Sequence, residues 1–267
     1  MYRGFNLESI EVPDSFFEIG HQLHSQHKAL VKSVLDEFIT PSGALDASKM
    51  QANWFPSIKS HVFISHSHRD ERTAISLAGW LKSLFSIEAF VDSCAWGFSD
   101  ELLRLIDYKF CYDKESDIYF YEQRNRSTSH VHMMLSSALM MMIDTCECIF
   151  FLNTPSSLLP KDSIGNSRDN LKTKSPWIYF EIAATQFMRK RSEKEHRGIK
   201  EAALSKSLLD REMNFLYNIN LNHLTDLSID VLNNWLKKKD DYRGAEGALD
   251  ALYELMPSSR HNKILYG

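Results

Sequence analysis

The sequence predicts an α/β fold in which a central parallel sheet is flanked by helices. Residues 61–93 carry the main signal, because they read as a strand, a turn, an amphipathic helix and a second strand. The first run, residues 61–65, is apolar without alternation, which is typical of a strand covered on both faces. A second apolar run at residues 146–153 predicts another central strand. A strand, a helix and a strand in this order form a βαβ unit, and such units build parallel sheets.

Helical periodicity supports the same fold class. Ser67 and Asp70 have the spacing of a capping box at a helix start. The apolar residues after them fall on one helical face, and the next strand is expected at residues 87–91. Further helices are expected at about residues 101–110, 130–145, 225–238 and 245–256, and a strand at residues 214–221. These elements would complete the sheet and cover it.

The N-terminal part is predicted to be a helical extension. Residues 1–14 are expected to be extended and loosely held, whereas apolar residues recur at helical spacing from Ser15 to Phe38. We expect this long helix to pack on the α/β domain; the alternative is a surface for a partner or an oligomer. The domain organisation is then an extension at residues 1–57 and an α/β domain at residues 58–260. That domain would carry an insertion near residues 111–129 and extra C-terminal helices.

Length, charge and cysteine usage narrow the function classes. The 267 residues hold one large domain or one domain with additions, and 43% of them are apolar, as in ordinary globular proteins. A net charge of −4 gives no sign of the basic surface that proteins use to bind nucleic acid. The four cysteines lack the spacing of a disulfide framework, and no apolar run reaches the roughly 18 residues needed to span a bilayer. We therefore expect a cytoplasmic protein with reduced thiols that binds neither nucleic acid nor membranes.

Polar residues follow three of the predicted strands. Ser65, Asp92 and Asn153 stand at or just after the strand ends, and parallel strands bring their carboxyl ends to one edge of a sheet. Such an edge is where ligands bind in open α/β sheets. Residues 94–100 are expected to form a loop beside it. Trp96 and Phe98 in this loop would cover a pocket or contact another protomer, or else pack into their own domain.

A second motif carries a lone carboxylate. Ser175 suits a helix N-cap and Pro176 the first helical position, which places Trp177 and Glu181 on one face of the helix. Glu181 is the only charged residue between positions 175 and 188. Because a carboxylate is costly to bury, it is expected to be either paired or used. The structural alternative is a buried glutamate that is bonded to the backbone or to a neighbouring arginine.

These two stretches together resemble a known family. The run Phe63-Ile64-Ser65-His66-Ser67, with Asp70 after it and Phe90-Val91-Asp92-Ser93 further on, is similar to the opening of a TIR (Toll/interleukin-1 receptor) domain. The run Ser175-Pro176-Trp177-Ile178-Tyr179-Phe180-Glu181 is similar to the Ser-x-Trp-x-x-x-Glu segment of NAD-cleaving TIR domains. The resemblance covers roughly residues 60–190. It implies a flavodoxin-like sheet and cleavage of the bond between nicotinamide and ribose in NAD+.

The resemblance also implies roles for individual residues. Glu181 would lie beside the ribose and stabilise the positive charge that develops there, as in glycoside hydrolysis. Trp177 would shape the pocket wall, and the remaining substrate-binding candidates are Ser65, His66, Ser67, Asp92, Trp96 and Asn153. NAD+ would be the substrate, with no cofactor and no metal, and the sequence has no Gly-x-Gly-x-x-Gly motif of a dehydrogenase.

Family partners and biology follow as expectations. TIR domains associate with one another, and bacterial NAD-consuming members serve antiviral defence. Their products are ADP-ribose, or a cyclic or conjugated ADP-ribose signal that a separate effector senses. The compact chain favours a signal producer similar to those of Thoeris defence.

Two other functions compete with this interpretation. A non-catalytic TIR scaffold would self-associate without turnover of NAD+. A metal-dependent hydrolase would use His66, His68 and Asp70, which match a His-x-His-x-Asp motif whose histidines bind zinc. The next residue of that motif is a histidine, but this chain has Glu71 there.

Overall fold

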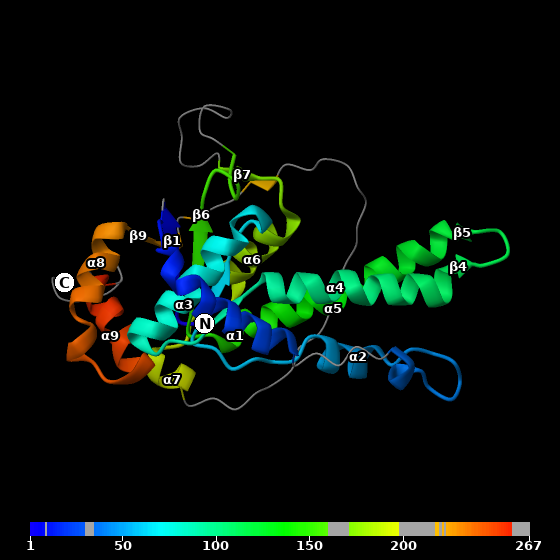
Figure 1. Ribbon diagram of the computed structural model, residues 1–267, viewed down its shortest axis with the longest axis horizontal. Helices are drawn as coiled ribbons and strands as arrows, with labels where there is room; N and C mark the ends of the chain where they lie inside the picture. Colours follow the sequence, from blue (N-terminus) through cyan, green and yellow to red (C-terminus); the bar gives the residue numbers. More distant parts are fainter. Residues whose placement is uncertain are drawn as a thin grey trace.

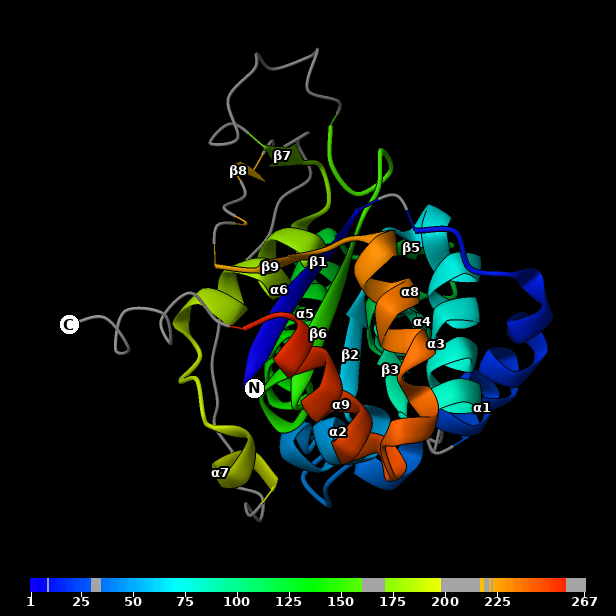
Figure 2. The ribbon, with the colours of Figure 1, turned by 90° about the vertical axis from the view of Figure 1, so that its left-hand side faces the viewer.

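The computed structural model describes residues 1–8, 10–29, 35–159, 171–197, 217–218, 221 and 223–257. Its centre is a five-stranded parallel sheet with the strand order β3-β2-β6-β1-β9. The strands are β1 (Arg3–Glu8), β2 (Val62–Ser65), β3 (Ala89–Val91), β6 (Cys148–Asn153) and β9 (Thr225–Leu227). Helices lie on both sides of the sheet (Figures 1 and 2). The prediction of a parallel α/β sheet flanked by helices is therefore confirmed.

The N-terminal strand was missed by the sequence analysis. β1 pairs with β6 on one side and with β9 on the other, and five of its six residues are buried. The prediction that residues 1–14 are loosely held is therefore wrong for β1, which belongs to the sheet rather than to an outlying extension. The strand order shows where the start of the chain lies in the sheet. From the strand of residues 89–91, the sheet runs through β2 and β6 to β1, so the chain start occupies the fourth position.

Two layers of helices cover the two faces of the sheet. Val62 and Ile64 of β2 face one hydrophobic cluster and Phe63 faces the other, as the alternation along a strand requires. The first cluster includes side chains of α3 (Glu71–Phe85), α8 (Ile229–Lys237) and α9 (Gly244–Leu255), and α1 (Phe17–Ala29) packs on α3. The second includes side chains of α2 (Ala47–Trp54), α4 (Ser93–Ile106) and α5 (Tyr121–Thr145). α6 (Pro176–Phe187) packs beside α5.

The backbone of the N-terminal helix α1 lies directly against the backbone of α3. A Cβ atom added at Gly79 of α3 would lie 2.1 Å from the carbonyl oxygen of Phe16, and one at Gly20 of α1 would lie 1.8 Å from that of Ile75. Two glycines therefore permit this approach. The predicted helix from Ser15 to Phe38 is shorter than expected: η1 (Asp14–Phe16) and α1 are followed later by η2 (Leu35–Phe38), and residues 30–34 lie outside the described part.

Two local predictions near the first strand were wrong. The side chain of Ser67 makes no capping hydrogen bond; η3 (His68–Asp70) comes first and α3 begins at Glu71. Residues 94–100 do not form a loop, because α4 starts at Ser93 and runs through them. Cys94 and Phe98 are buried on the inner face of this helix, and that burial outweighs the helix-weakening effect of Gly97.

The segment predicted as an insertion forms the tip of a helical arm. α4 continues as a short π-helical segment, η4 (Asp107–Cys111), and the antiparallel pair β4 (Tyr112–Asp113) and β5 (Ile118–Tyr119) leads into the 25-residue α5. Asp107 anchors the tip, since its carboxylate accepts hydrogen bonds from Arg124, at 2.9 Å, and from Ser127. In Figure 1 this arm extends well beyond the sheet. We call η4, β4, β5 and Phe120 to Tyr121 the arm tip.

The last elements add an edge strand to the sheet and cover one of its faces. β9 occupies the start of the segment that was predicted to be helical from residue 225, and α8 and α9 follow it. Trp235 of α8 stacks on Phe85 of α3 with ring centroids 3.9 Å apart and donates a hydrogen bond of 2.7 Å to the carbonyl of Ala248. The remaining short elements are β7 (Lys172–Thr173), β8 (Tyr217–Asn218), α7 (Glu193–Arg197) and η7 (Lys239–Asp241). None of the described helices is long and apolar enough to cross a membrane.

Candidate functional site

The carboxyl ends of β2, β3 and β6 meet at one edge of the sheet. β2 lies between the other two strands, and the parallel registers place Ile64 opposite both Val91 and Phe150. Ser65 ends β2, Asp92 follows β3, and Asn153 ends β6. The prediction that these strand ends share an edge is confirmed by the strand pairing.

Glu181 reaches this edge from α6. The hydroxyl of Ser175 accepts a hydrogen bond of 3.2 Å from the backbone N–H of Ile178, and Pro176 follows it at the first helical position. These local signals start the helix where the sequence predicted, and Glu181 falls in its second turn. The side chain of Glu181 has no exposed surface, and the hydroxyl of Ser65 donates a hydrogen bond of 2.6 Å to its Oε2. This bond joins two residues that the sequence separates by 116 positions.

His66, Asp92 and Trp96 complete a buried group next to Glu181. The backbone N–H of His66 donates a hydrogen bond of 3.2 Å to Oδ2 of Asp92, and Nδ1 of its ring lies against the other carboxylate oxygen. Trp96 of α4 stacks on the His66 ring, with the centroids 5.4 Å apart and the planes 24° apart. His66 and Asp92, like Ser65 and Glu181, have no exposed surface. We call Ser65, His66, Asp92, Trp96 and Glu181 the edge site.

Burial governs the charges in the edge site. It lowers the pKa of His66 to about 4, so the imidazole is neutral at neutral pH. Burial also raises the pKa of Asp92, and both burial and the neighbouring Asp92 raise that of Glu181. The short contact between His66 and Asp92 is within ion-pair distance. We nevertheless regard it as a contact between a neutral imidazole and a carboxyl group, because desolvation opposes charge on both.

Several polar atoms of the edge site lack partners. Oε1 of Glu181, Nε2 of His66 and Nε1 of Trp96 are buried and make no hydrogen bond within the described residues. Buried polar groups in native proteins are nearly always paired, so unpaired ones mark a place that a bound water, an ion or a polar ligand would complete. The edge site therefore offers an acceptor and two ring nitrogens to a polar ligand.

The other predicted site residues lie around the edge site without joining it. Trp177 is half-buried and meets the ring of His132 edge-on at 5.4 Å. The amide of Asn153 donates a weak hydrogen bond of 3.5 Å to Glu8 at the end of β1. Ser67 is half-buried, and its carbonyl accepts a bond of 2.7 Å from the backbone N–H of Asp70.

The structure separates the residues of the alternative metal motif. His66 is buried against Asp92, whereas His68 is exposed, and the carboxylate of Asp70 accepts a hydrogen bond of 2.6 Å from Thr154. No group of three or more His, Cys, Asp or Glu side chains in the described part of the chain is arranged to hold a metal ion.

Sequence reasoning missed a set of polar residues on β1 and β9. The amide of Asn6 donates hydrogen bonds to Glu8, at 3.2 Å, and to Asp226, at 3.0 Å. They extend the polar edge of the sheet beyond Asn153. The only sequence signal for them was the short run Arg3–Glu8, which has no adjacent strand or turn motif to mark it.

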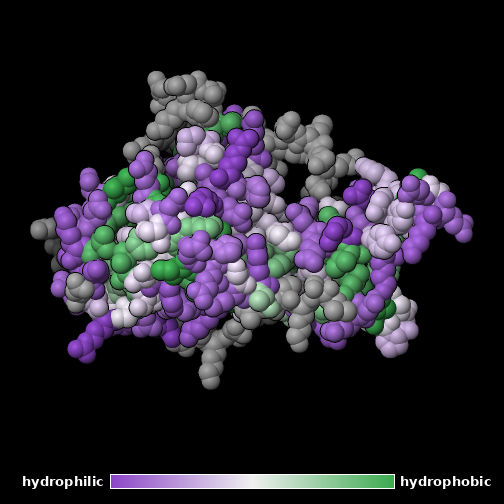
Figure 3. All heavy atoms as spheres, in the orientation of Figure 1, coloured by the Kyte–Doolittle hydropathy of each residue, from purple (hydrophilic) through white to green (hydrophobic). Residues whose placement is uncertain are grey.

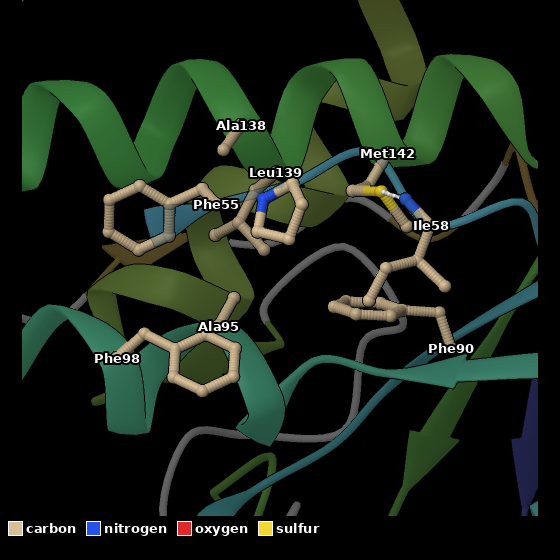
Figure 4. Close-up of a pocket in the computed structure, with 9 residues that line it drawn as sticks. Phe55, Ile58, Phe90, Ala95, Phe98, Ala138, Leu139 and Met142 are labelled. Atoms are coloured by element: carbon tan, nitrogen blue, oxygen red, sulfur yellow. Dashed lines mark hydrogen bonds between the residues drawn. The ribbon is translucent and has the colours of Figure 1, made fainter. Parts of the chain in front are cut away.

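A small cavity with an apolar lining includes none of the edge-site side chains. It is lined by the linker before β2 and by α4 and α5, as Figure 4 shows, with Phe90 at one side. The dashed line in that view is the hydrogen bond from the backbone N–H of Ile58 to the sulfur of Met142, at 3.3 Å. The cavity has room for about one water molecule. It offers no group for catalysis, so the edge site is the candidate functional site.

Comparison with protein-family models, with curated proteins and with solved structures found no match to this chain.

Proposed function

We propose that the chain is a TIR-like enzyme that cleaves the nicotinamide–ribose bond of NAD+. One observation carries the proposal: Glu181, the glutamate of the Ser-x-Trp-x-x-x-Glu segment, is buried at the carboxyl edge of the sheet and bonded to Ser65. A ligand site at this edge is what an open parallel sheet provides. Both motifs of the resemblance thus contribute to one group of side chains.

The proposed chemistry needs one carboxylate beside the ribose. When the bond to nicotinamide breaks, the ribose develops oxocarbenium-like positive charge and the bonding electron pair leaves with the nicotinamide nitrogen. That nitrogen is cationic in NAD+ and becomes neutral, so the leaving group needs no proton from an acid. An anionic Glu181 would stabilise the developing charge, and Ser65 orients its carboxyl group. Water or a hydroxyl of the same molecule then forms a bond to the ribose carbon and loses its proton to solvent, which gives ADP-ribose or a cyclic product.

The edge site is closed, which is consistent with an enzyme that requires activation. Glu181 has no exposed surface, and Trp96 lies on His66 at the start of α4. NAD+ therefore reaches the carboxyl group only after the side chains that bury it move aside. Self-association of TIR-like domains would supply such a trigger, and the product would act on a separate effector in an antiviral response.

The test is NAD+ consumption by the purified protein at high concentration, with analysis of the products. Glu181→Gln keeps the size of the side chain and removes its charge, and Asp100→Asn makes the same change at an exposed position on α4. We expect Glu181→Gln to lower turnover by about 100-fold or more and Asp100→Asn to leave it unchanged. Equal turnover in wild type and Glu181→Gln would contradict the proposal, and so would no turnover after forced assembly.

A non-catalytic scaffold is the second candidate, and the arm tip favours it. Exposed large apolar side chains gather there: Tyr108, Phe110, Ile118, Tyr119, Phe120 and Tyr121. In Figure 3 the end of the arm is mostly pale or hydrophilic, with a small hydrophobic spot. Such patches indicate association surfaces. Sedimentation velocity over a range of concentrations, with wild type and Tyr121→Ser, tests this function; a monomer at all concentrations would contradict it.

A further inference from the structure

A serine hydroxyl lies directly beside the carboxyl group of Glu181. The hydroxyl of Ser65 donates a hydrogen bond of 2.6 Å to Oε2 of Glu181, and neither residue has exposed surface. A hydroxyl within hydrogen-bond reach of a base is the arrangement that activates serine as a nucleophile. Ser65 therefore has the surroundings of a nucleophile, in addition to its effect on the orientation of Glu181.

The backbone holds this hydroxyl at a fixed place. Ser65 ends β2 and pairs with Phe151 of β6, so its peptide group belongs to the central sheet. On the other side, the backbone N–H of His66 donates a hydrogen bond of 3.2 Å to Asp92. Regular elements position reacting groups more precisely than loops do. Ser65 therefore presents its hydroxyl at the carboxyl edge of the sheet, where open α/β sheets bind their ligands.

Glu181 is suited to accept the proton of this hydroxyl. Burial and the neighbouring Asp92 raise the pKa of Glu181, so its carboxylate binds a proton more readily than an exposed one does. Its second oxygen, Oε1, is buried and makes no hydrogen bond within the described residues. The two oxygens of one carboxylate thus serve two purposes. Oε1 is left to face the ribose, and Oε2 already contacts the serine proton.

We propose that Ser65 is the acceptor in a self-ADP-ribosylation reaction, in which the ribose of NAD+ is transferred to the serine oxygen instead of to water. The bond between the ribose carbon and the nicotinamide nitrogen breaks, and its electron pair leaves with nicotinamide. A lone pair of Oγ of Ser65 forms the new bond to that carbon, and the Oγ proton passes to Oε2 of Glu181. The positive charge of the nicotinamide ring and the negative charge of Glu181 disappear together. This reaction rests on the proposed cleavage of NAD+.

The contact between Ser65 and Glu181 favours serine over water as the acceptor. A ribose carbon that touches the carboxyl group of Glu181 also lies next to the hydroxyl of Ser65, because the two groups are hydrogen-bonded. To leave again, the ribose would have to expel a serine alkoxide, which departs far less readily than neutral nicotinamide. We therefore expect the modified chain to accumulate during turnover. It should be inactive, because its own ADP-ribosyl group then fills the edge site.

The test is mass spectrometry of the wild-type protein during incubation with NAD+, at high concentration and with forced assembly. We expect a single ADP-ribosyl group per chain, located on Ser65 by fragmentation, and a turnover rate that falls as this adduct accumulates. Neutral hydroxylamine should leave the adduct in place, since it cleaves esters of carboxyl groups but not glycosides of serine. Turnover without an adduct, or an adduct that hydroxylamine removes from Glu181, would overturn the inference and leave the proposed function intact.

Variants separate a nucleophile from a residue that only orients Glu181. Ser65→Ala should lose the adduct and give a linear time course, at a lower initial rate because Glu181 is no longer oriented. Ser83→Ala removes an exposed hydroxyl of α3 and should acquire the adduct as wild type does. An adduct of wild-type amount in Ser65→Ala would overturn the inference. The wild-type adduct is measured whether or not Ser65→Ala folds. Absence of both turnover and adduct in wild type would overturn the proposed function together with the inference.

Discussion

The packing of α1 on α3 makes a quantitative prediction about a single methyl group. In Gly79→Ala the new Cβ atom would meet backbone atoms, since it would lie 2.1 Å from the carbonyl oxygen of Phe16 and 2.7 Å from the N atom of Gly20. Ordinary contact begins at 3.4 Å, so α1 has to withdraw by about 1.3 Å. Backbone atoms in a helix cannot turn aside as a flexible side chain can.

Two effects of opposite sign determine the size of the change. Alanine is better than glycine in a helix interior by about 1 kcal/mol, whereas overpacking costs about 1–3 kcal/mol. We expect Gly79→Ala to lower the free energy of unfolding by up to about 2 kcal/mol. The matched control is Gly97→Ala on α4, where no atom lies within 4 Å of the added Cβ. That variant should gain about 0.5–1 kcal/mol.

The assay is equilibrium unfolding in urea. The curves of the two variants are fitted with a common m-value, the slope of the free energy of unfolding against urea concentration. The result that refutes the reasoning is a Gly79→Ala protein that is as stable as Gly97→Ala, because α1 would then not lie on α3 at backbone distance. Gly20→Ala provides an independent check, since its Cβ would lie 1.8 Å from the carbonyl oxygen of Ile75.

Three further predictions concern charged and buried groups. Arg197 makes two hydrogen bonds of 3.0 Å to the buried carboxylate of Glu147. Because Arg197→Met would leave that carboxylate buried without its partner, we expect the free energy of unfolding to fall by about 3 kcal/mol. An unchanged free energy of unfolding in a urea titration would contradict this. Burial raises the pKa of Cys94 and of Cys146 to about 12, so mass spectrometry should find alkylation of both thiols only at the rate of unfolding, and rapid labelling of the native protein would be inconsistent with their burial. Burial lowers the pKa of His24 to about 4, so the neutral side chain contributes fully to the free energy of unfolding above the unfolded value of 6.5. This contribution is lost as the pH falls towards 4, so His24→Gln should lose less stability than wild type between pH 7 and pH 4. Equal losses in thermal unfolding would disprove the assignment.

The sequence by itself determined the elements whose signals are local. The apolar run before Ser65, the helical stripe of α3 and the N-cap at Ser175 each lie within a few residues of the structure they produce. They suffice to predict a parallel sheet with Ser65 and Asp92 at one edge. The helix that carries Glu181 follows in the same way, because Ser175 and Pro176 fix its start and the spacing fixes its faces.

The tertiary structure alone decided what depends on distant partners. The six residues of β1 form a strand because β6 and β9 satisfy their backbone groups on both sides, and a sequence of that length carries no record of those neighbours. Residues 94–100 are helical because the inner face of α4 buries Cys94 and Phe98, although the local composition favours a loop. The hydrogen bond between Ser65 and Glu181 likewise forms only when α6 packs against the sheet edge. Long-range burial, which local spacing does not encode, is the physical reason in all three cases.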